Sequence, residues 1–72
     1  MEDGNNKILY QQVGQRIRER RRQMNISQVR LAELLGMSYQ QIQKYESGQN
    51  QLTLNRLLQF SSILNVSPDY FY

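Results

Sequence analysis

The stretch QVRLAELLGMSYQQIQKYES, residues 28–47, decides the fold. Apolar residues recur at helical spacing on both sides of a short central break, which predicts helices over residues 28–35 and 39–47. Gly36 opens the break and tolerates the positive φ that a tight turn needs, because it has no Cβ. Ser38 closes it and, with a glutamine three positions later, forms the S-x-x-Q pattern of a capping box. The stretch is therefore predicted to form a helix, a tight turn and a second helix.

A helix-turn-helix also needs a small residue where the helices cross and apolar residues that face inward from both. Ala32 supplies the small residue. The inward-facing set is expected to be Leu31, Leu35, Met37, Ile42 and Tyr45. A glycine turn between two helices is common by itself, but the complete set is specific to the helix-turn-helix.

Helical spacing continues on both sides of this stretch. One apolar stripe runs through Val13, Ile17 and Met24, and Leu34 belongs to the stripe of the second helix. A later stripe contains Leu54, Leu57, Leu58, Ser61 and Leu64. These stripes predict helices over about 8–24 and 54–64, and the sequence Ser67-Pro68-Asp69 predicts a fifth helix from residue 68 onward.

Helix ends are marked by cap residues, and no stretch alternates with the period of a strand. Ser27 and Thr53 are suited to N-caps, and Asn25 and Asn65 to left-handed C-terminal positions. The predicted fold class is a compact all-α domain of five helices over residues 8–72, preceded by a flexible N-terminal segment, residues 1–7.

The composition argues against catalysis. The 72 residues include no His and no Cys, so the usual general base and the commonest soft metal ligands are missing. The six acidic residues show no i,i+3 or i,i+4 pairing. A non-enzyme without cofactor or metal is expected. The sequence also has no leader and no run of about 18 apolar residues, so a cytoplasmic protein that does not bind membranes is expected.

Positive charge is concentrated in one part of the chain. The formal net charge is +3, but residues 16–30 hold six arginines against the single acid Glu19. Such a run is either a solvated helix face or a surface for an acidic partner. Because Arg16, Arg18, Arg20 and Arg22 cannot all point one way on a helix, no individual role is assigned to them.

Several segments together resemble the lambda-repressor-like family, the Cro/repressor type of helix-turn-helix. They are Ile17-Arg18-Glu19-Arg20-Arg21, Ile26-Ser27-Gln28, Leu31-Ala32-Glu33-Leu34-Leu35-Gly36, Met37-Ser38, Ile42, Tyr45-Glu46-Ser47-Gly48, Leu57-Leu58 and Leu64-Asn65-Val66-Ser67-Pro68. The resemblance covers more than 50 of the 72 residues. It implies a DNA-binding domain that usually acts as a dimer on a palindromic operator.

The resemblance also implies that the helix over 39–47 enters the DNA major groove. Periodicity turns Ile42 and Tyr45 inward, which leaves an outer face expected to read base edges: Tyr39, Gln40, Gln43 and Lys44. The alternative is a polar, solvated face without sequence readout. Expected phosphate contacts are Gln28, Ser38, Gln41, Gln49 and Asn50.

The family pattern pairs Arg21 with Glu46 in a partly buried ion pair, so Arg21 is expected to be structural. At the carboxyl end, Tyr70, Phe71 and Tyr72 either close the core or form the contact of a homodimer. The function expected is a dimeric, sequence-specific repressor on double-stranded DNA. Two alternatives remain open: an antitoxin-type protein-interaction module, and a controller of a restriction–modification system.

Overall fold

The computed structural model describes the backbone of residues 3–72 and the side chains of residues 7–72. Its elements are α1 (Asp3–Gln23), α2 (Gln28–Leu35), α3 (Tyr39–Ser47), α4 (Leu54–Leu64) and the 3-10 helix η1 (Pro68–Phe71). The bounds of α2, α3 and α4 are those predicted from the sequence. The described part of the chain is all-helical, as expected.

Two elements differ from the prediction. Helix α1 begins at Asp3 instead of residue 8, because residues added ahead of a formed helix only propagate it and avoid the cost of nucleation. Of the segment expected to be flexible, residues 1 and 2 lie outside the described part. The fifth helix starts at Pro68 as predicted, but it is a four-residue 3-10 helix, a length typical of that geometry.

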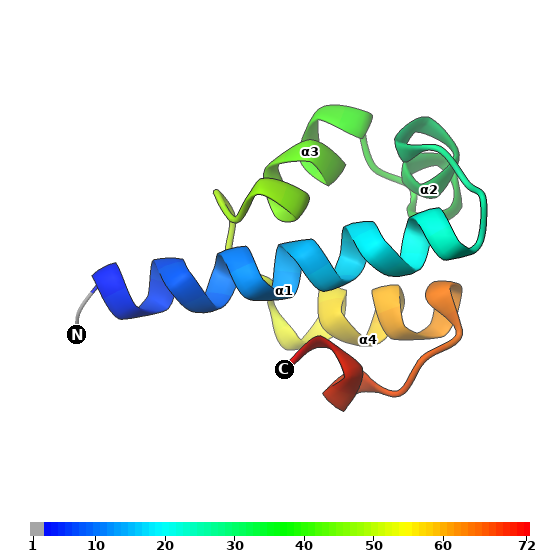
Figure 1. Ribbon diagram of the computed structural model, residues 1–72. Coiled ribbons are helices and arrows are strands. Elements are labelled where there is room, and N and C mark those ends of the chain that lie inside the picture. The colour runs from blue at the N-terminus through cyan, green and yellow to red at the C-terminus, as the bar shows by residue number, and fades with distance from the viewer. Residues whose placement is uncertain (1–2) are drawn as a thin grey trace.

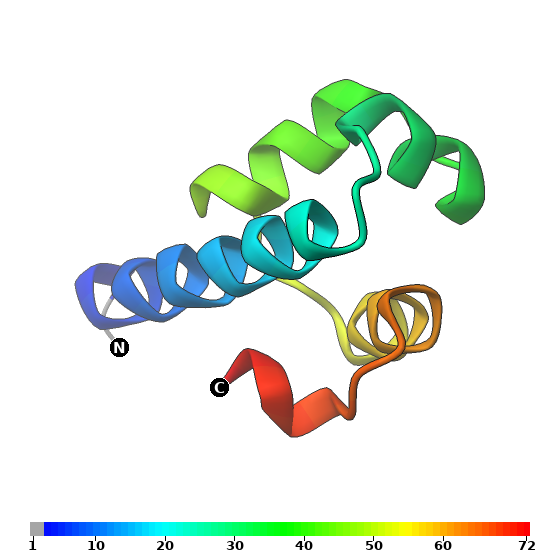
Figure 2. The same cartoon turned by 45° about the vertical axis from the view of Figure 1, so that its right-hand side comes forward.

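Helix α1 lies in the middle of the molecule. Helix α3 packs along one side of it, and α4 lies on the other side (Figure 1). Helix α2 joins α3 at one end, and η1 contacts both α1 and α4. Turned by 45°, the fold shows α1 between the α2–α3 pair and the α4–η1 pair (Figure 2). The two helices of the helix-turn-helix therefore form one outer side of the domain.

Each short α-helix is closed at both ends by the residues that the sequence marks. The hydroxyls of Ser27, Ser38 and Thr53 accept hydrogen bonds from the backbone N–H groups of Arg30, Gln41 and Arg56. The residues that follow the helices, Gly36, Gly48 and Asn65, are left-handed, with φ of 68°, 84° and 57°. These caps fix where α3 begins and ends on the surface.

The core is formed by ten buried apolar residues drawn from every element. They are Val13, Ile17, Leu31, Ala32, Ile42, Tyr45, Leu57, Phe60, Leu64 and Phe71. Tyr45 and Phe60 pack edge to face, with ring centroids 5.6 Å apart. This contact joins α3 to α4 in the centre of the domain.

The inward face of α4 is rotated relative to the predicted stripe. Phe60, which the stripe did not include, is fully buried, whereas Leu54 and Leu58 are 72% and 48% exposed. Leu34 of α2 is also exposed. The reason is that a short helix turns only a narrow sector toward the core, and the large ring of Phe60 occupies that sector opposite Tyr45.

Gly14 sets the distance between α1 and α3. A Cβ at this position would lie 2.3 Å from the carbonyl oxygen of Tyr45 and 2.6 Å from that of Glu46. Only glycine lets the two backbones approach this closely. This close approach was not predicted, because a glycine inside an apolar helical pattern does not reveal which segment crosses it.

Candidate nucleic-acid interface

Helix α3 has a buried face and an exposed face, divided as its periodicity predicts. Ile42 is fully buried, and Tyr45 and Glu46 are buried beside it. The exposed side chains are Tyr39, Gln40, Gln41, Gln43, Lys44 and Ser47. A polar face rich in amides, with one ammonium group and one phenol, is thus held rigidly at the surface by a packed apolar face.

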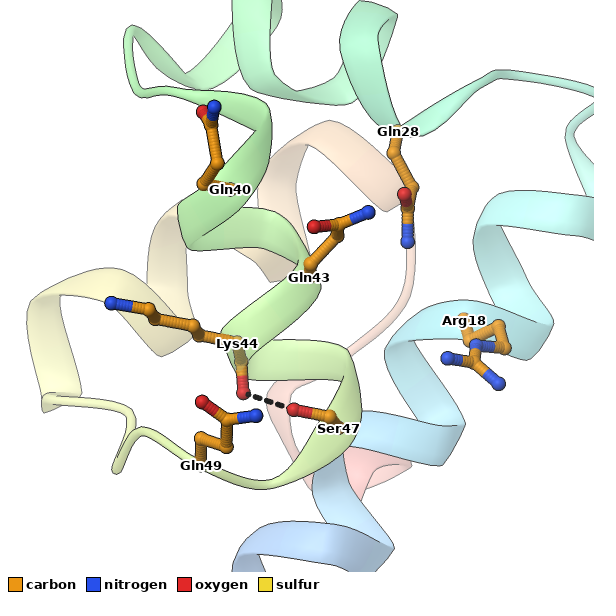
Figure 3. Close-up of a pocket in the computed structure, with 7 residues that line it drawn as sticks. All are labelled: Arg18, Gln28, Gln40, Gln43, Lys44, Ser47 and Gln49. Carbon is orange, nitrogen blue, oxygen red and sulfur yellow. Dashed lines mark hydrogen bonds between the residues drawn. The ribbon is translucent and has the colours of Figure 1, made fainter.

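This exposed face borders an open groove to which α1, α2 and α3 all contribute (Figure 3). The groove is lined by Arg18, Gln28, Gln40, Gln43, Lys44, Ser47 and Gln49. The side chains of Gln28 and Gln43 point toward one another across it, while Lys44 extends to the other side of α3. Five of the nine residues predicted to contact DNA meet at this groove.

The other four predicted residues lie outside the groove lining. Tyr39 is 42% exposed at the first position of α3. The hydroxyl of Ser38 caps α3 by accepting from Gln41 N–H, and the Gln41 side chain is exposed. Asn50 is half-buried and lines a second recess together with Leu52 and Tyr72. Asn50 therefore follows the groove residue Gln49 but does not line the groove itself.

Glu46 is the centre of a buried polar network beneath the groove. Arg21 donates from Nε to Glu46 Oε2 at 2.7 Å and from Nη2 to Oε1 at 3.2 Å. Arg18 Nε and Gln28 Nε2 also donate to Oε1, at 3.3 and 3.0 Å. The structure thus brings together the expected pair of Arg21 and Glu46, which links α1 to α3, and Gln28 connects α2 to the same carboxylate.

The pKa of Glu46 reflects two opposing effects. Burial disfavours the carboxylate and would raise the pKa, but the hydrogen bonds from Arg21, Gln28 and Arg18 and the charge of Arg21 outweigh it. The pKa of Glu46 is consequently lowered from 4.5. Glu46 is therefore an ionised, fully hydrogen-bonded carboxylate at neutral pH.

Gln28 has a second role that the sequence analysis did not assign. Its amide nitrogen donates to Glu46 Oε1, which fixes the orientation of the side chain at the start of α2. An amide nitrogen carries two N–H groups, so one remains for another acceptor. The nearby N–H groups of the first turn of α2 also lack helical partners, as in every α-helix.

The arginines left unassigned from the sequence divide between two sides of α1. Arg16 donates to the carbonyl of Tyr70 at 2.8 Å, and Arg20 to the carbonyl of Leu64 at 2.8 Å. Both fasten α1 to the carboxyl-terminal part of the chain. Arg18 instead lines the groove, as does Ser47, and neither was predicted there. No periodicity signal separates these arginines, because their partners are distant in sequence.

No helix in the described part of the chain is long and apolar enough to cross a membrane. No group of three or more His, Cys, Asp or Glu residues comes together there in a way that would hold a metal ion.

Comparison with known proteins gives consistent matches. The profile of the helix-turn-helix family matches residues 17–71. The HTH-type transcriptional regulator y4aM of Sinorhizobium fredii is 52% identical over 60 residues, which are 83% of this chain and 42% of that protein. Repressor protein C2 of Salmonella phage P22 is 37% identical over 60 residues, 83% of this chain and 28% of the repressor.

A solved structure matches over the whole fold. The restriction-modification controller protein C.AhdI from Aeromonas hydrophila superposes with a TM-score of 0.87 at 28% identity, covering 99% of this chain and 100% of the controller. The chain spans less than half the length of the regulators of S. fredii that it matches. The family profile, the relatives and the superposition agree, and the chain belongs to the Cro/repressor type of helix-turn-helix proteins.

Proposed function

We propose that the chain binds double-stranded DNA in a sequence-specific way and regulates transcription, with α3 lying in the major groove. The observation that carries this proposal is the division of α3. Ile42 and Tyr45 anchor one face in the core, and the opposite face presents polar side chains beside a groove whose described lining residues include no acid. Membership of a family of transcriptional regulators supports the same function.

The exposed side chains of α3 have the chemistry needed to read bases. Gln40 and Gln43 can each pair bidentately with adenine N6 and N7, and Lys44 can donate to guanine O6 and N7. Tyr39 can contact a thymine methyl group or donate to a phosphate. All four are exposed, so contact with base edges requires no rearrangement of the core.

Backbone contacts are proposed around the two helix starts and the segment after α3. Gln28 and the first turn of α2 offer N–H donors to one phosphate, and Gln41 with the Ser38-capped start of α3 offers donors to another. Gln49 and Asn50 follow α3 and extend this set. Ser38 contributes mainly through its backbone, since its hydroxyl already accepts from Gln41 N–H.

The biological unit is proposed to be a homodimer that represses by occupying a palindromic operator and excluding RNA polymerase in the cytoplasm. Two copies of α3 would then enter successive major grooves about 34 Å apart. Phe71 is fully buried and Tyr70 half-buried, so a dimer contact through the carboxyl-terminal segment would rest chiefly on Tyr72, which is 57% exposed. The protein works by occupying DNA and not by catalysis.

A second candidate is the control of a restriction–modification system. The superposition on the controller C.AhdI, with a TM-score of 0.87 at 28% identity, supports this candidate. Both functions share the DNA-binding surface. They differ in the genes on either side of the operator, which a chromatin pull-down with sequencing identifies.

Selection of bound sequences from a random duplex pool tests the proposal. The expected result is enrichment of one site with two symmetric halves about one helical turn apart. Recovery of an unenriched pool would refute sequence-specific binding. Enrichment of a single half-site would retain DNA binding and refute the dimer.

A further inference from the structure

Arg18 carries a positive charge at the groove that the neighbouring carboxylate does not balance. Among the residues whose side chains the structure describes, Glu46 is the single acidic partner of both Arg18 and Arg21. Arg21 is the closer partner, at 2.7 Å, with a side chain only 10% exposed, whereas Arg18 lies at 3.3 Å and is 41% exposed. One carboxylate between two guanidinium groups leaves a net charge of about +1, and this charge is at the surface on the exposed Arg18.

The hydrogen-bonding pattern leaves most donors of Arg18 available. Its bond to Glu46 uses Nε, and a guanidinium carries five N–H groups in a planar fork. The terminal nitrogens, with four of these N–H groups, thus remain for another acceptor. Arg18 stands on α1 and shares the groove with Gln28 and Gln43, and none of the described residues that line this groove is acidic (Figure 3).

The same carboxylate oxygen orients the neighbouring donor. Glu46 Oε1 accepts from both Arg18 Nε and Gln28 Nε2, so one buried oxygen holds an α1 side chain and an α2 side chain at the same edge of the groove. A planar guanidinium fork beside an amide N–H matches the two free oxygens of a phosphodiester.

We propose that Arg18 binds a backbone phosphate of DNA, and that Glu46 is the positioning residue that presents Arg18 and Gln28 to it. This inference rests on the proposed function, because it assigns one more contact within the same DNA interface. It extends that interface from the helix-turn-helix itself to α1.

Salt dependence of DNA binding measures such a contact. The probe is a short fluorescein-labelled duplex of mixed sequence, followed by fluorescence anisotropy from 50 to 200 mM salt. Each phosphate contact contributes a slope of about 0.9 in log K against log salt, which is a factor of about 3.5 over this range. Arg18→Gln is expected to lower the slope by about 0.9 per bound chain and to weaken binding equally on all sequences.

Two comparison variants make the result specific. Arg20→Gln removes the same charge from the opposite side of α1, where Arg20 contacts Leu64 of α4, and should leave the slope unchanged. Arg18→Lys keeps the charge and loses the Nε bond to Glu46, and should keep most of the slope. Thermal melts of all variants verify folding.

Each outcome decides the proposal. Loss of slope in Arg18→Gln alone supports it. An unchanged slope in Arg18→Gln, together with lower melting temperatures for Arg18→Gln and Arg18→Lys, would show that Arg18 only stabilises the fold through Glu46. That result would overturn this inference and leave the proposed DNA binding intact. No binding by the wild-type protein at 50 mM salt would instead overturn the proposed function, and this inference with it.

Discussion

Removal of Arg21 is expected to destabilise the domain more than removal of any exposed arginine. Arg21 supplies two of the four hydrogen bonds to Glu46, the shortest included, and also donates to the carbonyl of Ile26 at 3.0 Å. Arg21→Ala leaves the carboxylate of Glu46, whose side chain is fully buried, with Arg18 and Gln28 only. Breaking a buried pair by removing one partner costs about 3–5 kcal/mol.

The lower end of that range applies because two donors to Glu46 remain. A loss of about 3 kcal/mol corresponds to a fall in melting temperature of roughly 12–24 °C in a domain of this size. It is a large part of the total, since a chain of 72 residues has a free energy of unfolding of roughly 4–11 kcal/mol. Arg21→Ala should therefore fold at low temperature and melt early.

The assay is thermal unfolding at neutral pH followed by circular dichroism, with Arg30→Ala as the matched control. Arg30 also pairs with a glutamate, Glu33, at 3.2 Å, but the two side chains are 58% and 61% exposed. Exposed pairs are worth about 0–1 kcal/mol, so Arg30→Ala should melt within a few degrees of the wild type.

A double variant distinguishes the cost of an unpaired buried carboxylate from the cost of lost packing. Arg21→Met with Glu46→Leu replaces both charges by apolar groups, and it should melt closer to the wild type than Arg21→Ala does. If Arg21→Ala melts like Arg30→Ala, the buried network does not stabilise the domain and the structural role given to Arg21 is refuted. DNA affinity measured well below the melting point should change less than stability.

Three further perturbations have defined outcomes. Because the pKa of Glu46 is lowered in the folded state, the stabilising effect of its carboxylate is complete above pH 4.5 and is lost as the pH falls through the folded-state pKa. Urea titrations at several pH values should therefore show that acid destabilises the wild type more steeply than Glu46→Gln, and an equal loss of stability in both proteins would contradict this. Gly14→Ala should lower the free energy of unfolding by roughly 2 kcal/mol despite the better helix propensity of alanine, since the new Cβ would lie 2.3 Å from the carbonyl oxygen of Tyr45. Gly36→Ala has open space around the Cβ but a φ of 68°, and it should lose only about 1–2 kcal/mol. Chemical denaturation compares the two variants, and an undiminished stability of Gly14→Ala would show that α1 and α3 can separate freely. Lys44→Ala should weaken binding to the selected DNA site by about 1–3 kcal/mol in anisotropy titrations without changing the melting temperature. An equal loss of affinity on unrelated duplexes would show that Lys44 contacts the DNA phosphates and not a base.

Local signals predicted most of the fold. The bounds of α2, α3 and α4 follow from apolar spacing together with caps such as Ser27, Ser38 and Gly48, which act within a few residues along the chain. The beginning of α1 and the 3-10 form of η1 were missed. Helix propensity is a weak guide to the residue at which a helix begins, and packing decides whether a short turn becomes α-helical or 3-10.

Among the candidate DNA-contacting residues, exposure could be predicted from the sequence wherever helical periodicity alone determines it. The outer face of α3 follows from the burial of Ile42 and Tyr45. Arg18 was not predicted at the groove, because its position depends on Glu46, 28 residues away in sequence. The close approach at Gly14 and the burial of Phe60 likewise depend on which helices cross, and helical spacing within one segment does not contain that information.

Three parallel selections from one random duplex pool show whether the exposed face of α3 reads bases. A random duplex pool is selected in parallel with the wild type, with Gln40→Ala, and with Gln12→Ala, which removes an exposed glutamine of α1. Gln40→Ala is expected to lose a preference for adenine at one position in each half-site, while the other two proteins select the same complete site. Identical base preferences in all three selections would contradict it.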